Sequence, residues 1–186
     1  MSNLTSQKID DLVALSGVYR LLGRLWLREV DQPLLNELAS PPFASEFSTN
    51  GANESLQDLS IDYCQLFIGP KDHLPPYQSV WQTGQFQSST VVSMTDFVEV
   101  VGYQPPDDAM FDHLGIQLDV MAHICSTSTA TETTEIFEAF FMRHLTWPTE
   151  FLQKAQTRAQ TDFYRSVIRL TGEFLQSQRA TGITLP

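Results

Sequence analysis

The side chains that could do chemistry in this chain are few: two cysteines, four histidines and acidic residues spread along its length. Cys64 and Cys125 each lie in a helical apolar pattern and neither belongs to a CxxC pair, so neither a zinc site nor a disulfide framework is indicated. Cys64 and His73 would form a nucleophile and base only if the fold brought them together. Because Cys64 has no local activator, a small hydrolase that uses Cys64 or His113 is only a third alternative.

The histidines do not suggest a metal site. His113 and His123 lie ten residues apart on one predicted helix, which is more than two turns and too far for them to share an ion. The chain also has no glycine-rich phosphate loop, no recognisable pair of catalytic carboxylates and no basic patch with interleaved aromatics. The sequence therefore predicts a protein that is not an enzyme and that holds no metal or other cofactor.

Length and composition predict one globular domain spanning residues 1–186, with a hydrophobic content of 42%. No apolar run approaches the roughly 18 residues of a membrane span, and residues 1–6 do not resemble a secretory signal. These features favour a cytoplasmic location. The formal net charge of -11 argues against binding to nucleic-acid phosphates and favours cationic partners.

Residues 63–81 stand apart from the rest of the chain. An apolar helix end is broken by Gly69 and Pro70, and an extended loop rich in proline and aromatic residues follows. Aromatic side chains in a loop need a surface to pack on or a partner to bind. They could plug one end of a helical bundle, or they could line a groove for an apolar peptide segment. In the second case Leu66 and Phe67 form the floor, and Pro76, Tyr77 and Trp81 form the walls.

Apolar residues recur every three or four positions along most of the chain, which predicts an all-α fold, a compact helical bundle with short connections. A strand competes with a helix only at residues 90–101, which hold five valines. Residues 126–133 are rich in serine and threonine and are expected to be a mobile linker and a possible hinge. Helices are expected at residues 9–28, 33–38, 54–68, 90–101, 109–126, 135–145, near 151–152 and at 162–178.

Three local expectations follow from this pattern of helices. Gly17 and Gly23 lie inside the first helix, where they would permit close packing of a neighbouring helix. Asp107 and Asp108 are expected to cap the helix that begins at residue 109. Asp112 and His113 would then lie in its first turn.

The signature Tyr63-x-x-Leu66-Phe67-x-Gly69-Pro70, followed by Pro76-Tyr77-x-Ser79-Val80-Trp81, resembles that of the TorD/DmsD/NarJ family of cytoplasmic redox-enzyme maturation chaperones, most closely its TorD/DmsD side. The resemblance extends from about residue 63 to residue 175. One departure is that Trp147 precedes Pro148, whereas the family usually has the proline first, so no site role is carried onto Trp147. The further matching elements are Asp112-His113-Leu114-Gly115, Phe140-Phe141-x-x-His144-Leu145 and Phe163-Tyr164-Arg165.

The resemblance implies an all-helical chaperone that is a monomer or a domain-swapped dimer. It further implies binding of the twin-arginine signal peptide and the apo form of a molybdenum-cofactor oxidoreductase, help with cofactor insertion, and delay of export. Asp112 would orient the arginines of the peptide and His113 would line the same pocket. The alternative is an unrelated helical adaptor that binds another amphipathic peptide. The expected peptide-binding residues are Tyr63, Leu66, Phe67, Gly69, Pro70, Pro76, Tyr77, Ser79, Trp81, Asp112 and His113.

Overall fold

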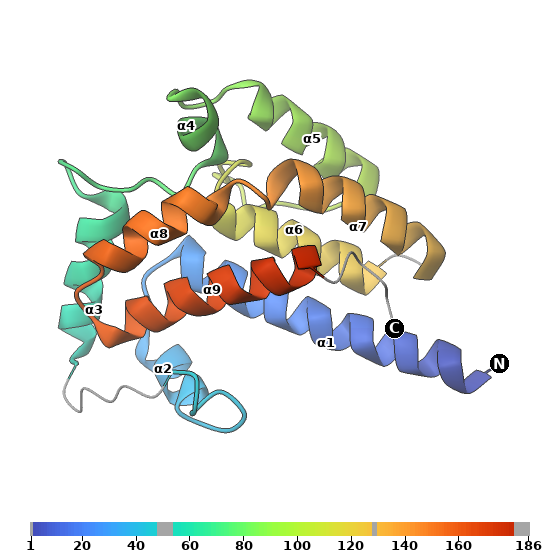
Figure 1. Ribbon diagram of the computed structural model, residues 1–186, viewed down its shortest axis with the longest axis horizontal. Helices are drawn as coiled ribbons and strands as arrows, with labels where there is room; N and C mark the ends of the chain where they lie inside the picture. The colour runs from blue at the N-terminus through green and yellow to red at the C-terminus, as the bar shows by residue number, and fades with distance from the viewer. Residues whose placement is uncertain (1, 48–53, 128–129, 181–186) are drawn as a thin grey trace.

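The computed structural model describes residues 2–47, 54–127 and 130–180, and every regular element in these ranges is a helix (Figure 1). The predicted all-α class is confirmed, and residues 90–101 form a helix rather than a strand. No helix in the described ranges is long and apolar enough to cross a membrane. The elements are α1 Ser2–Leu27, α2 Gln32–Leu38, α3 Leu56–Tyr63, the π-helical turn η1 Cys64–Ile68, α4 Gln78–Thr83, α5 Ser89–Val101, α6 Leu114–Thr127, α7 Ala130–His144, α8 Pro148–Arg158 and α9 Asp162–Ala180.

Helix α6 is the centre of the bundle. Ten of its 14 residues are buried, as expected for a helix that has other helices on most of its sides. It packs most extensively against α1, with α5 and α7 on its other sides, and α8 and α9 lie in front of it in Figure 1. The site described below is built around the N-terminal end of this helix.

Two glycines allow α1 and α6 to approach each other closely. A Cβ atom on Gly115 would lie 2.6 Å from Leu27 Cγ and 2.9 Å from the carbonyl oxygen of Gly23, and a Cβ on Gly23 would lie 3.0 Å from the carbonyl oxygen of Gly115. The expectation for Gly23 is therefore met. The expectation for Gly17 is wrong, because no described atom lies within 4 Å of the Cβ position there.

One end of the bundle is held together by aromatic rings. The Phe67 ring lies 5.2 Å from Trp26, 5.3 Å from Tyr63 and 6.2 Å from Phe151, measured between ring centroids. Such edge-to-face and tilted pairs each add about 0.5–1.5 kcal/mol beyond the area they bury. The indole Nε1 of Trp26 donates a hydrogen bond of 2.9 Å to Thr171 Oγ1, which ties α1 to α9.

Helix α9 begins where two carboxylates from the α3 region accept its free backbone N–H groups. Asp62 is buried and accepts hydrogen bonds from the backbone of Gln160 and from the backbone and hydroxyl of Thr161. Glu54 accepts from the backbone N–H of Asp162 at 2.6 Å. These contacts supply capping between segments far apart in the sequence and fix α3 against α9.

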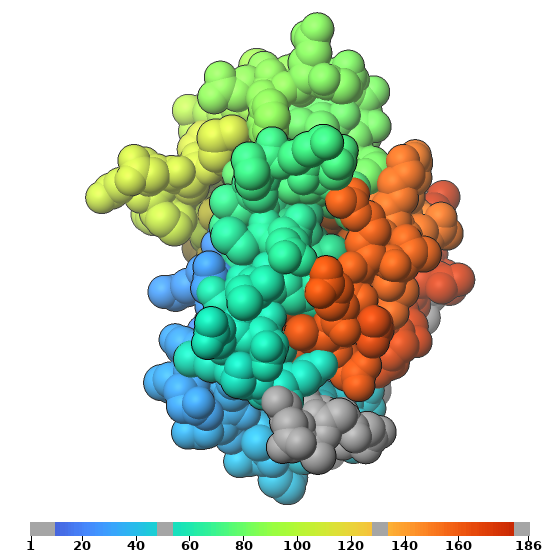
Figure 2. Space-filling view, turned by 90° about the vertical axis from the view of Figure 1, so that its left-hand side faces the viewer, coloured from blue at the N-terminus to red at the C-terminus, as the bar shows by residue number. Residues whose placement is uncertain are grey.

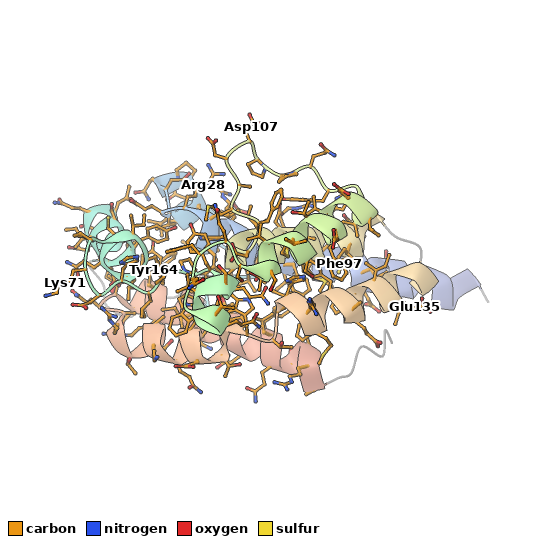
Figure 3. All side chains as sticks on the ribbon, turned by 90° about the horizontal axis from the view of Figure 1, so that it is seen from above. Arg28, Lys71, Phe97, Asp107, Glu135 and Tyr164 are labelled. Carbon is orange, nitrogen blue, oxygen red and sulfur yellow. The ribbon has the colours of Figure 1, made fainter. Side chains whose placement is uncertain are left out.

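Several helix boundaries differ from those predicted. Helix α1 begins at Ser2 rather than near residue 9, and α8 spans Pro148–Arg158 rather than a short stretch near residues 151–152. Residues 78–83 form α4 inside what was expected to be an extended loop. Helix α6 begins at Leu114 rather than at residue 109, because residues 106–109 form a turn closed by the Ala109 N–H and the Pro106 carbonyl at 3.0 Å. Asp107 and Asp108 are exposed and do not cap α6, and Asp107 projects away from the protein (Figure 3). Helix α7 begins at Ala130, inside the expected linker; residues 128–129 lie outside the described ranges, so the hinge stays a prediction.

The two glycine positions predict opposite effects of alanine on stability. At Gly17 the extra methyl meets no atom and removes unfolded-chain entropy, so Gly17→Ala should raise the free energy of unfolding by about 0.5–1 kcal/mol. At Gly115 the same entropic gain is outweighed by the clash with the Gly23 carbonyl oxygen. Gly115→Ala should therefore lower the free energy of unfolding by about 1–3 kcal/mol. Urea denaturation of the two variants measures both, and equal effects would contradict the close approach of α1 and α6.

Candidate functional site

The segment that carries the signature starts with a widened helical turn. In η1 the N–H of Gly69 bonds to the carbonyl of Cys64 at 2.6 Å, a bond between residues five apart that defines a π-helical turn, a feature often found at functional sites. The chain then folds back, and the Leu74 N–H bonds to the Leu66 carbonyl at 2.6 Å. Figure 2 shows this part of the chain, in teal to green, between the loop that precedes α6, in yellow-green, and α8, in orange.

The two predicted site elements, residues 76–79 and residues 112–114, lie side by side. Tyr77 and His113 form an isolated antiparallel β-bridge. The Gln78 N–H donates to the Asp112 carbonyl at 2.9 Å, and the Leu114 N–H donates to the Pro76 carbonyl at 2.8 Å. The sequence left open whether these elements meet, and the bridge places them in direct backbone contact.

Asp112 lies in this bridge rather than in the first turn of a helix, where it was expected. Its carboxylate Oδ2 accepts the backbone N–H of Ser79 at 3.0 Å, so it satisfies a free N–H at the start of α4. The other carboxylate oxygen, Oδ1, and the Ser79 hydroxyl are both buried and have no hydrogen-bond partner among the described residues. A buried carboxylate oxygen without a partner is costly, and here it lies within the predicted site.

His113 is neutral in this environment. Its Nδ1 accepts the Gly115 N–H at 3.0 Å, so the ring proton is on Nε2. Burial lowers the pKa of His113 to about 4, and the neighbouring Asp112 charge opposes this shift without overcoming it. His113 can therefore offer a neutral hydrogen-bond donor at pH 7 but no positive charge.

A row of three rings leads from His113 to the surface. The Tyr77 ring lies 5.0 Å from the His113 ring, and the Phe86 ring lies 5.3 Å from Tyr77, both edge to face. Phe86 has 54% of its surface exposed. The sequence interpretation missed Phe86, although a single large apolar residue in the polar stretch of residues 82–89 was a usable signal. Burial, followed by the Asp112 charge, raises the pKa of Tyr77.

The other predicted groove residues are more deeply packed than expected. Leu66 and Phe67 are only 2% and 6% exposed, so they do not form an accessible floor in this structure but belong to the aromatic core. Tyr63, Pro76 and Ser79 are also buried, whereas Gly69 and Pro70 lie nearer the surface.

Trp81 is half-buried and is held from three directions. Its Nε1 donates to the Pro75 carbonyl at 2.8 Å, its ring lies 5.4 Å from Phe151, and Lys154 Nζ lies 5.1 Å above the ring. The rings of this segment therefore pack on the end of the bundle, and Tyr77, Trp81 and Phe86 retain exposed surface.

A buried polar network behind α4 was not predicted at all. The Gln78 side-chain oxygen accepts from Gln117 Nε2 at 2.6 Å and from His144 Nδ1 at 2.9 Å, while its Nε2 donates to the Arg143 carbonyl at 2.8 Å. Gln117 Oε1 in turn accepts the indole N–H of Trp147 at 2.8 Å. The network joins α4, α6, α7 and the start of α8, so it fixes the position of the bridge described above.

The network also sets the protonation of His144. Because Gln78 Oε1 can only accept, Nδ1 of His144 carries the proton, and Nε2 accepts from the Ser93 hydroxyl at 3.1 Å. Burial, with a smaller effect of Arg143, lowers the pKa of His144 to about 4. The matching His-Leu element of the sequence is thus a structural part of this site.

The two cysteines lie in different environments. Cys125 is buried, and burial raises the pKa of its thiol to about 12, so it is not a nucleophile at neutral pH. Cys64 is exposed, in η1. Among the described residues, no group of three or more histidine, cysteine or acidic side chains is arranged to hold a metal ion.

Comparison with known proteins identifies the family. Residues 28–169 match the sequence model described as the nitrate reductase delta subunit. Since this range is most of the chain, the protein belongs to that family, the TorD/DmsD/NarJ redox enzyme maturation chaperones, and the resemblance seen in the sequence is confirmed.

Individual relatives agree with this assignment. The chain is 29% identical over 171 residues to the chaperone protein YcdY of Escherichia coli K12, covering 85% of this chain and 90% of the relative. It is 28% identical over 125 residues to a Haemophilus influenzae protein named as a probable Tat proofreading chaperone DmsD, covering 64% and 60% of the two chains. These relatives are named as chaperones and not as enzymes, which confirms the prediction that the chain is not an enzyme.

The fold also has a counterpart among solved structures. The crystal structure of an Archaeoglobus fulgidus protein assigned to redox enzyme maturation superposes with a TM-score of 0.61 over 89% of this chain and 93% of that chain. At 17% sequence identity this likeness supports the all-helical fold alone.

The neutral histidines predict a loss of stability in mild acid. An unfolded histidine takes up a proton near pH 6.5, whereas buried His144 does so only near pH 4, so stability falls as the pH drops between these values. From pH 7 to pH 5 each such histidine should cost about 2 kcal/mol. Urea denaturation of His144→Gln should therefore show a loss over this range that is about 2 kcal/mol smaller than that of the wild type.

Ser93→Ala is the matched control, because it removes a partner of the ring and keeps the titrating group. It should retain the pH dependence of the wild type. An unchanged pH dependence in His144→Gln would show that the His144 ring is not held neutral.

Proposed function

We propose that this protein is a cytoplasmic chaperone that binds the twin-arginine signal peptide and the apo form of a molybdenum-cofactor oxidoreductase. It assists insertion of the cofactor and delays export until the enzyme is mature. The proposal is carried by two buried groups at the point where the two signature elements meet. Neither Asp112 Oδ1 nor the Ser79 hydroxyl has a hydrogen-bond partner in the part of the chain that the structure describes.

The chemistry of these two groups suits an arginine side chain. A guanidinium group offers five N–H donors in a planar fork and pairs with carboxylates more specifically than an ammonium group does. Asp112 Oδ1 and Ser79 Oγ can each accept one of those donors. The neutral His113 ring beside them adds no opposing positive charge. The net charge of -11 favours the approach of a cationic peptide.

Reaching Asp112 requires a movement, because this side chain has no exposed surface. Tyr77 packs on the His113 ring next to Asp112, and Phe86 packs on Tyr77. The turn that holds Phe86 lies between Gly84 and Gln87, both with positive φ angles, and a non-glycine residue in that region carries some strain. We infer that the incoming peptide displaces Phe86 and Tyr77 from this row.

The same residues can hold the apolar segment of the peptide. Tyr77, Trp81 and Phe86 present partly exposed rings, and burying them against apolar side chains contributes roughly 25 cal/mol per Å². Tyr63 packs on Phe67, and Phe67 packs on Phe151, which contacts Trp81. These core residues, with Leu66, therefore act by position rather than by contact. No bond is made or broken: the chaperone covers the leader and holds it with the apoenzyme before export.

Calorimetric titration with a twin-arginine signal peptide tests the assignment. Asp112→Asn keeps an oxygen for the Ser79 N–H but removes the charge, so it should weaken binding tenfold or more, which is about 1.4 kcal/mol. Tyr77→Ala should weaken binding to a similar degree. Replacing both arginines of the peptide by lysine should weaken binding to the wild type, but should have little further effect in Asp112→Asn.

Val100→Ala is the matched control for loss of an apolar surface side chain, because Val100 is 75% exposed on α5 and belongs to neither signature element. It should bind like the wild type. Unchanged affinity in both Asp112→Asn and Tyr77→Ala, with folding intact by circular dichroism, would refute the site assignment.

A further inference from the structure

The negative charge of this protein is concentrated in one part of the chain. Residues 72–142 hold ten of the 22 acidic residues and none of the 11 basic residues, so they account for almost all of the formal charge of -11. This segment forms α4, α5, α6 and most of α7. It also contains Tyr77, Phe86 and Asp112 of the proposed leader site.

Ion pairs do little to neutralise the carboxylates of this segment. Asp119 lies 4.0 Å from Arg20, but no other carboxylate among the described side chains of residues 72–142 pairs with a lysine or arginine. The exposed carboxylates of residues 72–142 therefore keep their attraction for an external cation. Elsewhere in the described chain, six carboxylates pair with lysine or arginine: Asp31, Glu37, Glu46, Glu150, Asp162 and Glu173.

Two of these carboxylates lie on the loop of residues 104–112, here called the acidic loop. Asp107 and Asp108 are both exposed, and Asp107 projects away from the protein (Figure 3). Four residues of chain lead from Asp108 to Asp112, so their Cα atoms are at most about 14 Å apart. The turn that the His113 N–H closes on the Met110 carbonyl, at 3.0 Å, shortens this path. The exposed carboxylates are therefore close to the proposed arginine site.

The inner end of the acidic loop holds the unpaired groups of that site. Asp112 and Ser79 are fully buried, and neither Asp112 Oδ1 nor Ser79 Oγ has a hydrogen-bond partner among the described residues. A buried carboxylate oxygen without a partner favours a donor that also carries positive charge. The loop thus leads from exposed carboxylates to a buried one, which points to a ligand with more than one cation.

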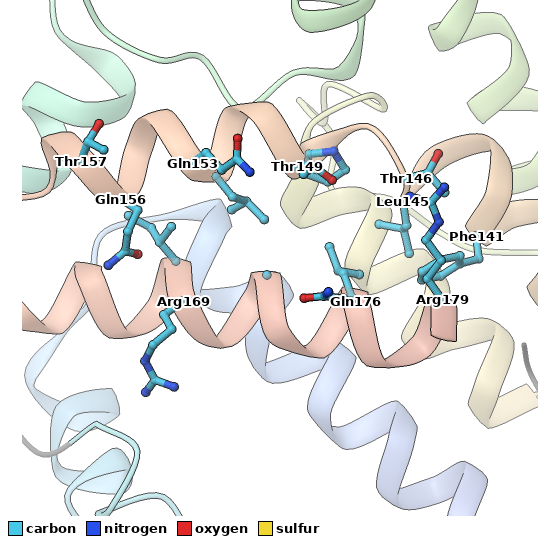
Figure 4. Close-up of a pocket in the computed structure, with 15 residues that line it drawn as sticks. Phe141, Leu145, Thr146, Thr149, Gln153, Gln156, Thr157, Arg169, Gln176 and Arg179 are labelled. Carbon is cyan, nitrogen blue, oxygen red and sulfur yellow. The ribbon is translucent and has the colours of Figure 1, made fainter. Parts of the chain in front are cut away.

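The opposite border of the site has a different charge. Figure 2 shows the segment of residues 63–81 between the acidic loop, in yellow-green, and α8, in orange. On α8, Lys154 Nζ lies 5.1 Å above the Trp81 ring and 2.7 Å from the Glu150 carboxylate, and Arg158 is exposed. The groove between α8 and α9 has no carboxylate among the described residues that line it (Figure 4). The acidic surface therefore does not continue across α8.

We propose that the leader binds in one direction, with the cationic segment that precedes its arginines over the acidic loop; this inference rests on the function proposed above. One arginine reaches Asp112, and a cation three or four residues before it pairs with Asp107 or Asp108. Three or four extended residues span about 10–14 Å, enough to cover the distance between these carboxylates. The cationic region of a signal peptide precedes its apolar region, so the apolar region lies on the exposed rings toward α8.

Calorimetric titration with two synthetic peptides tests this direction. Each peptide has a pair of arginines followed by an apolar segment of about 12 residues. The two differ only at the position four residues before the first arginine, which is lysine in one and glutamate in the other. At low salt the wild type should bind the lysine peptide at least about threefold more tightly. The preference should largely disappear at 1 M salt, where the Debye length is about 3 Å.

Reciprocal changes of charge locate the contact. Asp107→Lys combined with Asp108→Lys should reverse the preference, so that the glutamate peptide binds at least about threefold more tightly than the lysine peptide. Glu135→Lys combined with Glu138→Lys is the matched control. It makes the same change of charge at two exposed positions of α7, and Glu135 lies far from Asp107 in Figure 3. The control should keep the preference of the wild type.

The proposal is overturned if the double variant of the acidic loop keeps the preference of the wild type, or if the α7 control changes it equally. It is also overturned if Lys154→Glu changes the preference and the loop variant does not, because the leader then lies in the opposite direction. Binding that depends on Asp112 but not on Asp107 and Asp108 refutes this inference alone. If the wild type binds neither peptide, the leader site itself is refuted, and this inference with it.

Discussion

The antiparallel pairing of residues 76–78 with residues 112–114 fixes where every other part of the candidate site lies. It joins the end of the signature loop to the start of α6, the most buried helix of the bundle. The Gly23–Gly115 contact holds α6 against α1. The pairing therefore attaches the signature loop to a closely packed part of the core. Asp112 is consequently held between these segments. One carboxylate oxygen accepts the Ser79 N–H of α4, and the other has no partner among the described residues.

The buried network behind α4 explains why polar residues occur at core positions. Gln78, Gln117 and His144 satisfy one another, so their burial carries no unpaired polar group. Trp147 joins them through Gln117, and Pro148 occupies the first turn of α8, where proline fits well. The reversed order of tryptophan and proline is therefore compatible with the packing that the family elements require here.

Charge and packing act together at the proposed leader site. The net charge of -11 favours the approach of a cationic peptide, while Tyr77 packs on the His113 ring and Phe86 packs on Tyr77. The proposed binding of a leader at Asp112 therefore requires that these two rings move aside.

The sequence by itself determined the helical class, most of the helices and the two signature elements, because these depend on local periodicity, on breakers such as Gly69-Pro70 and on residue types within one segment. Only the tertiary structure decided that Asp112 caps α4, that Phe67 lies in the core, that Phe86 extends the ring row and that Gln78 meets His144. These features depend on contacts between segments far apart in the chain, which no local pattern encodes. The same reason explains why α6 begins five residues later than its apolar period suggested: the pairing with residues 76–78 competes with helix formation there, and the buried bridge prevails.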